Sequence, residues 1–64
     1  MKYAVVIEKA GQNYSAYIPD LPGCIATGKT IAETENRIKI AIEMHIDGMM
    51  EDGIAVPVPA TVLL

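Results

Sequence analysis

The clearest chemical signature in this chain lies between Gly23 and Thr30. These residues read Gly-Cys-Ile-Ala-Thr-Gly-Lys-Thr and match the phosphate-binding loop pattern G-x-x-x-x-G-K-[ST]. In such a loop, backbone amides bind the phosphates, Lys29 would contact the β- and γ-phosphates, and the Thr30 hydroxyl would bind magnesium. Taken alone, the pattern predicts binding of a nucleoside triphosphate.

The residues in and around this octapeptide argue against a phosphate loop. Such a loop follows a buried strand and contains no strand of its own, whereas Pro22 precedes it here and the β-branched Ile25 and Thr27 favour extended pairing inside it. The loop also needs an acidic residue on a distant strand to help hold magnesium, and Val56–Leu64 contains no carboxylate. We therefore interpret the octapeptide as a turn, a short strand and the start of a helix.

Neither the cysteine nor the histidine of this chain has a neighbour in sequence that would make it catalytic. Cys24 is the only cysteine, and it stands beside a turn without a paired base, which favours a packed thiol. His45 flanks an apolar stripe, and no nucleophile is close to it in sequence. Because no second thiol or histidine stands at metal-ligand spacing, we expect no catalytic residue, no metal site and no cofactor.

Length and charge limit the functional classes further. The 64 residues suffice for a single domain, residues 1–64. A lone cysteine excludes an internal disulfide and fits a reducing cytoplasm, and so small a core favours self-association or a partner chain. The formal net charge of −3 is unlike that of nucleic-acid-binding proteins, which cluster Lys and Arg, and it suits a basic partner. We find no run that predicts an export signal or a membrane span.

Apolar periodicity predicts four strands and one helix. We expect the strands, in order, at Lys2–Glu8, Tyr14–Ile18, Cys24–Thr27 and Ala60–Leu64. Thr30 followed by Glu33 is the pattern of a capping box, which predicts the start of a helix, and Gly53 is placed to cap the helix end. This order of elements predicts an α+β fold of two layers, in which one long helix packs across a sheet.

The predicted helix carries a core stripe and a separate apolar pair. Projected at about 100° per residue, the stripe consists of Ile31, Ile38, Ile42 and Met49. Ile40 and Met44 lie four residues apart and point away from this stripe, among charged residues, and Met50 extends the pair. Because adjacent exposed apolar side chains indicate a contact surface, we predict that they mediate self-association or bind a partner.

Several of these residues together resemble the HicB antitoxin family. The resemblance rests on Tyr17–Cys24, which read Tyr-Ile-Pro-Asp-Leu-Pro-Gly-Cys, on Gly28-x-Thr30, and on a helix with Ala41-Ile42 and His45. It implies a partly trimmed ribonuclease H-like sheet in the order β-β-β-α-β, with the last strand parallel to the first. It also implies a partner, a small basic HicA-like toxin that cleaves messenger RNA. Many members carry a C-terminal DNA-binding module, but this chain stops at Leu64, so we expect no direct DNA binding.

A ribonuclease H-like architecture does not by itself predict a nuclease. Enzymes of that class gather several carboxylates around metal ions. The first predicted strand would present Tyr3, Val5 and Ile7 inward, and none of these is acidic. Glu43 and Asp47 lie on the polar face of the helix. We therefore expect a protein that is not an enzyme.

Three functional hypotheses follow. The leading hypothesis is a stand-alone antitoxin domain that neutralises a basic ribonuclease toxin in the cytoplasm and forms a dimer or tetramer. The second is a small oligomeric ligand- or peptide-binding domain without a toxin partner, and the third is nucleotide binding at the Gly23–Thr30 match. For contact with a partner, the candidate residues are Tyr17, Asp20, Leu21, Ile40, Met44 and Met50.

Overall fold

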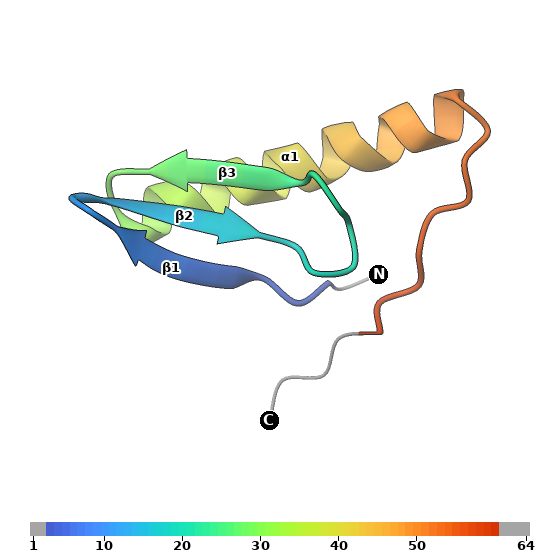
Figure 1. Cartoon of the computed structure of the whole chain (residues 1–64). Helices are drawn as coiled ribbons and strands as arrows, with labels where there is room; N and C mark the ends of the chain where they lie inside the picture. Colours follow the sequence, from blue (N-terminus) through green and yellow to red (C-terminus); the bar gives the residue numbers. More distant parts are fainter. Residues whose placement is uncertain (1–2, 61–64) are drawn as a thin grey trace.

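Three strands and one long helix make up the described part of the computed structural model, residues 3–60. The elements are β1 (Val6–Ala10), β2 (Asn13–Tyr17), β3 (Ile25–Gly28) and α1 (Ile31–Glu51). The strands form one antiparallel sheet in the order β1-β2-β3, and α1 lies across one face of it (Figure 1). This arrangement confirms the predicted α+β fold of two layers. The predicted last strand falls outside the described residues except for Ala60, which has no strand geometry.

A two-residue turn joins β1 to β2. Gly11 has a φ of 63°, and the residue after it does not have a positive φ, which is the pattern of a type II′ turn and suits the twist of an antiparallel hairpin. The turn pairs Ala10 directly with Asn13. β1 therefore runs to Ala10, beyond the predicted end at Glu8, and its pairing with β2 begins at Val6.

The core lies between the sheet and the first half of α1. Its fully buried apolar side chains are Ala16, Ile18, Leu21, Cys24 and Ile38. Strand register places Ile7, Ala16 and Ala26 side by side, which gives the helix an apolar floor to pack on. Of the predicted helix stripe, Ile38, Ile42 and Met49 face this core, whereas Ile31 at the first turn is exposed.

The turn between β2 and β3 directs Leu21 into the core. Three backbone hydrogen bonds close this turn: Ile18 N–H to Cys24 O at 3.2 Å, Leu21 N–H to Ile18 O at 3.1 Å, and Cys24 N–H to Leu21 O at 3.0 Å. Gly23 follows with a φ of 83°, a conformation that favours glycine. Leu21 is only 1% exposed. The prediction that Leu21 contacts a partner is therefore wrong, because its side chain fills the domain's own interior.

Gly28 is where β3 meets the start of α1. A Cβ atom on this residue would lie 2.6 Å from Thr34 Oγ1 and 2.9 Å from the Thr34 backbone nitrogen. Thr34 is fully buried, and its hydroxyl donates to the Thr30 carbonyl at 2.7 Å. Glycine is needed here because the helix backbone approaches the strand so closely.

Both ends of α1 are capped by residues that the sequence predicts. Thr30 Oγ1 accepts from the Glu33 amide at 3.0 Å, as a capping threonine should. In a full capping box, the Glu33 carboxylate would accept from the Thr30 amide. Here it pairs with Arg37 Nη2 at 2.6 Å instead. At the other end, Gly53 has a φ of 68° and its amide donates to Met50 O at 3.2 Å. With the Ile54 amide bonded to Met49 O at 2.8 Å, this is a Schellman motif.

After α1, the chain returns toward the N-terminal end of the sheet (Figure 1). Two hydrogen bonds that involve side chains link this return segment, residues 54–60, to the rest of the described chain. The Tyr3 hydroxyl donates to Pro57 O at 2.5 Å, and the Ala60 amide donates to Asp20 Oδ2 at 3.2 Å. The segment thus connects the first described residues with the turn after β2.

Candidate partner-binding surfaces

The residues of the Gly23–Thr30 match, which suggested nucleotide binding, form β3 and the cap of α1. The stretch between Gly23 and Gly28 contains β3, so it does not form the strand-free loop that would surround a phosphate. The Thr30 hydroxyl accepts a hydrogen bond from the first turn of α1, as the cap of the helix. Burial raises the pKa of the Cys24 thiol through desolvation, which favours the protonated form and makes it a poor nucleophile.

The described residues show neither a metal-binding cluster nor a helix that could span a membrane. Within residues 3–60, no group of three or more His, Cys, Asp and Glu side chains comes together in a way that could hold a metal ion. In the same part of the chain, no helix combines the length and apolar character that a membrane span requires.

The predicted interface residues do not form one continuous site. Tyr17 is 39% exposed and lies on the sheet face that α1 does not cover. Ile40, Met44 and Met50 are exposed on α1, and Met44 is 69% exposed. Asp20 is half-buried, and its carboxylate holds the return segment. Tyr17 therefore lies on a different surface from Ile40, Met44 and Met50. Asp20 instead stabilises the fold of its own domain through the return segment.

The uncovered face of the sheet carries an apolar row that the sequence reasoning missed. Register pairs Val6 with Tyr17 and Tyr17 with Ile25, so the three side chains cross the sheet in one line. Ile25 is 65% exposed. β-branched alternation in Cys24–Thr27 could have indicated an outward isoleucine, but the row itself depends on the pairing of strands far apart in sequence.

Arg37 covers part of the open edge of β3. Along an antiparallel pair of strands, hydrogen-bonded and non-hydrogen-bonded residue pairs alternate. Ile18 N–H bonds to Cys24 O, so the pairs that contain Ile25 and Thr27 are non-hydrogen-bonded, and the backbone groups of these two residues point away from β2. Arg37 Nη1 donates to the Thr27 carbonyl at 3.0 Å. A charged side chain at this position blocks the edge against pairing with another strand.

Charge is distributed unevenly along the chain. All five Lys and Arg residues lie within residues 1–39, together with four acidic residues. Residues 40–64 contain no Lys or Arg, and their acidic residues are Glu43, Asp47, Glu51 and Asp52. The net negative charge of the protein therefore comes from the second half of α1 and its C-terminal cap.

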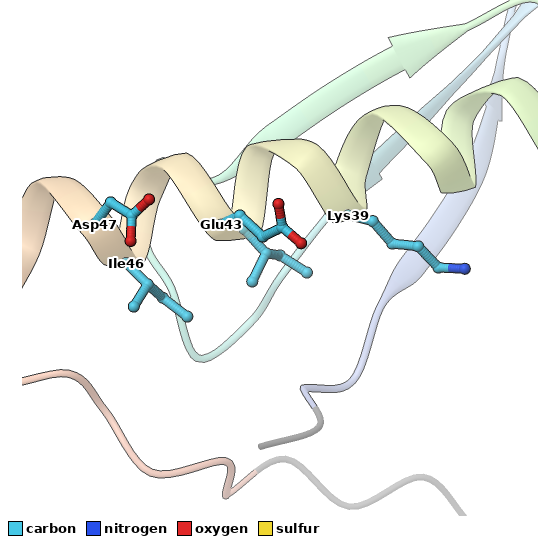
Figure 2. A pocket seen from close by; sticks show the side chains of 5 residues that line it. Lys39, Glu43, Ile46 and Asp47 are labelled. Carbon is cyan, nitrogen blue, oxygen red and sulfur yellow. The ribbon is translucent and has the colours of Figure 1, made fainter.

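A groove of about 480 Å³ lies along this acidic half of the helix. Its lining residues are Lys39, Ile42, Glu43, Ile46 and Asp47. Figure 2 shows the carboxylates of Glu43 and Asp47 along one side of α1, with Ile46 beside them and Lys39 one turn earlier. At about 100° per residue, the acidic pair projects between the Ile42–Ile46 pair and the Ile40–Met44 pair. The groove thus has an apolar floor and an acidic rim.

Comparison with known proteins identifies the family. The model of the HicB_like antitoxin of bacterial toxin-antitoxin system matches residues 3–63. The chain belongs to the HicB-like antitoxin family. Its fold agrees with this membership, since a chain of the HicA3 and HicB3 toxin-antitoxin complex superposes with a TM-score of 0.79 and 30% identity, covering 94% of this chain and 70% of that chain.

Curated relatives extend the comparison beyond solved structures. An uncharacterized 14.9 kDa protein in the rep-hol intergenic region of Haemophilus phage HP1 is 42% identical over 57 residues, which are 89% of this chain and 43% of that protein. A UPF0150 protein of Archaeoglobus fulgidus is 41% identical over 56 residues, 83% of this chain and 81% of the relative. This HicB-like chain therefore spans less than half the length of the phage relative.

In this HicB-like chain, the residues that carry the family resemblance have structural roles. Gly23 completes the turn after β2, Gly28 allows the close approach of α1, and Thr30 caps the helix. Membership in an antitoxin family points to protein binding rather than to catalysis. The surfaces that could bind a partner are the sheet row and the outer side of α1.

Proposed function

We propose that this HicB-like chain is an antitoxin that binds and neutralises a small basic HicA-like ribonuclease, a toxin that cleaves messenger RNA. The observation that carries the proposal is the structural match, over 94% of this chain, to a chain of the HicA3 and HicB3 complex. The family model over residues 3–63 supports it. The chain would act in the cytoplasm by covering the active face of the toxin, without chemistry of its own.

The outer side of α1 is the surface we assign to the toxin. Ile40 and Met44 are exposed neighbours four residues apart, and Met50 is exposed near the helix end. Exposed methionines suit a contact surface because their flexible, polarisable side chains adapt to a partner. Acidic residues surround these apolar side chains, as charged residues surround the apolar centre of many interfaces.

Electrostatics supports a basic partner. The four acidic residues of the chain's second part lie between Glu43 and Asp52 and give it a formal charge of −4, whereas residues 1–39 carry +1. These carboxylates lie in the second half of α1 and at its cap, in an elongated domain with extents of 38 × 27 × 15 Å. A concentrated negative patch accelerates encounter with a basic protein and makes the association rate fall as salt increases. We therefore expect toxin binding to weaken with ionic strength mainly through slower association.

Self-association through the sheet face is the second part of this proposal. Residues 3–60 form two layers, and within them no helix or strand covers the apolar row of Val6, Tyr17 and Ile25. A second copy packed sheet against sheet would cover both rows at once. The small core favours such a dimer, since one core of this size contributes only a few kcal/mol of net stability.

Co-expression with the candidate toxin tests the proposed function. The toxin candidate is a short basic protein with a catalytic histidine, encoded by a gene adjacent to that of this chain. We expect that protein to arrest growth when expressed alone, the antitoxin to restore growth, and the two to copurify. Growth arrest that persists in the presence of this chain, together with no copurification, would overturn the proposed function.

Paired substitutions on α1 test the assigned surface. Ile40→Glu combined with Met44→Glu removes two apolar contacts and would bury two carboxylates in their place, so we expect at least a tenfold loss of toxin affinity by calorimetry. Ile54→Glu combined with Val58→Glu is the matched control, because both residues are also exposed and apolar but lie in the return segment. Equal affinity of the paired variant and the control would show that this side of α1 does not touch the toxin.

A further inference from the structure

The second half of α1 is poorly covered by its own domain. The fully buried residues of the helix are Thr34 and Ile38, both in its first half. α1 packs on β2 and β3, and its last turns extend past the ends of these strands (Figure 1). Ile42 and Ile46 pack against the core cluster, but both are only half-buried, so part of each side chain remains accessible. A helix that extends beyond its sheet while keeping apolar side chains offers them to another molecule.

The charges on this half of the helix oppose its own stability. The C-terminal end of a helix carries a partial negative charge, and cations there are favourable. α1 has no basic residue in its last turn, and Glu51 lies in that turn with Asp52 as the cap. A carboxylate in such a position is unfavourable at low salt. A cationic group from a partner would relieve this unfavourable charge.

Neither rim carboxylate of the groove is neutralised within the described chain. The ion pair found among the side chains of residues 3–60 joins Glu33 to Arg37, near the other end of α1. Glu43 and Asp47 are one helical turn apart, so their carboxylates flank the same stretch of groove. Two adjacent carboxylates beside an apolar floor match both parts of a lysine or arginine side chain, its hydrocarbon stem and its charged head.

We propose that this groove binds a basic side chain of the toxin. The stem of the lysine or arginine lies on Ile42 and Ile46, and its charged head bonds to the carboxylates of Glu43 and Asp47. Lys39 closes the N-terminal end of the groove with a like charge, so the incoming side chain enters from the Asp47 end. This assignment rests on the proposed function, because the basic side chain belongs to the toxin partner.

Isosteric neutralisation of the groove tests the assignment. Glu43→Gln combined with Asp47→Asn keeps the side-chain volumes and removes both charges, and the variant should fold because both positions are exposed. We expect a loss of toxin affinity of at least tenfold at low salt, with a smaller dependence of affinity on salt. The matched control is Glu8→Gln combined with Glu35→Gln, which changes the net charge equally at two exposed positions outside the groove. The toxin affinity of this control should fall by less than threefold.

A second variant removes the positive charge at the groove instead of the negative ones. Lys39→Gln removes the resident cation and should raise toxin affinity at low salt by about threefold, whereas Lys29→Gln, away from the groove, should not. If the wild type binds the toxin but groove and control variants lose affinity equally, the groove assignment is overturned while the antitoxin function stands. If the wild type itself neither binds nor neutralises the toxin, the proposed function fails and the groove assignment fails with it.

Discussion

We expect Gly28→Ala to destabilise this domain, because the added methyl group has no room. Gly48 is the other glycine without a positive φ, and Gly48→Ala should not have this effect. The new Cβ would lie 2.6 Å from Thr34 Oγ1, 2.9 Å from Thr34 N and 3.1 Å from Thr34 Cα. Two of these atoms are helix backbone, so relief requires α1 to move away from β3. The Thr34 hydroxyl cannot simply rotate away, because it is buried and donates to Thr30 O at 2.7 Å.

The expected magnitude follows from these contacts. Overpacking of a rigid interior costs about 1 to 3 kcal/mol, and loss or weakening of the Thr34 hydrogen bond adds about 1 kcal/mol. We therefore expect Gly28→Ala to lower the free energy of unfolding by about 2 to 4 kcal/mol. A domain of this length has a total of about 3 to 10 kcal/mol, so the variant would be marginal near room temperature.

Gly48→Ala is the matched control, because the same methyl group there meets nothing within 4 Å. Gly48 lies inside α1, so alanine should stabilise the domain by about 1 kcal/mol. Urea denaturation followed by circular dichroism, at several protein concentrations, measures both variants. If Gly28→Ala proves as stable as the wild type while Gly48→Ala is stabilised, the close approach of α1 to β3 does not constrain the fold and the reasoning is refuted.

Three further predictions concern the cap, the sheet face and the buried thiol. Thr30→Ala should cost about 1 kcal/mol in urea denaturation, because it removes the acceptor for the Glu33 amide; an unchanged midpoint would contradict this role. Tyr17→Glu combined with Ile25→Glu should reduce the sedimentation mass to that of a monomer, whereas Ile54→Glu should not; equal masses would argue against the sheet-face dimer. Burial raises the pKa of the Cys24 thiol, so the stability that this thiol contributes is complete below its ordinary pKa and is lost as the pH rises above it. Urea midpoints between about pH 7 and pH 10 should therefore fall more steeply for the wild type than for Cys24→Val, and parallel curves would refute this coupling.

Local signals in the sequence predicted the three strands that the structure describes, the helix and the residues that end it, whereas the predicted strand Ala60–Leu64 lies outside the described residues except for Ala60, which is not in a strand. Thr30 and Gly53 bound the helix as expected, because capping depends on backbone groups within one turn of the residue. Strand boundaries were less accurate, since β1 extends to Ala10 through a pairing that the two-residue turn at Gly11 imposes. The turn type depends on the dihedral angles of both central residues, which the sequence restricts but does not specify.

Candidate surfaces were harder to predict, because exposure depends on contacts between distant residues. Leu21 stands in a polar turn with two prolines and reads as a surface residue, yet the hydrogen bonds of that turn direct it into the core. Ile25 was predicted only as part of a strand, and register then aligned it with Tyr17 on the open face. Ile40 and Met44 were predicted to be exposed, because helical periodicity alone places them opposite the core stripe.

By itself, the sequence determined the family, the class of fold and the choice against a phosphate loop, because these rest on residue types at fixed spacing. Only the tertiary structure decided why Gly28 must be glycine, since the constraint comes from Thr34 on another element. It also decided that Glu43 and Asp47 border an apolar groove on an overhanging helix. The physical reason is the same in both cases: short-range geometry is encoded locally, whereas space and burial arise only when separate elements pack together.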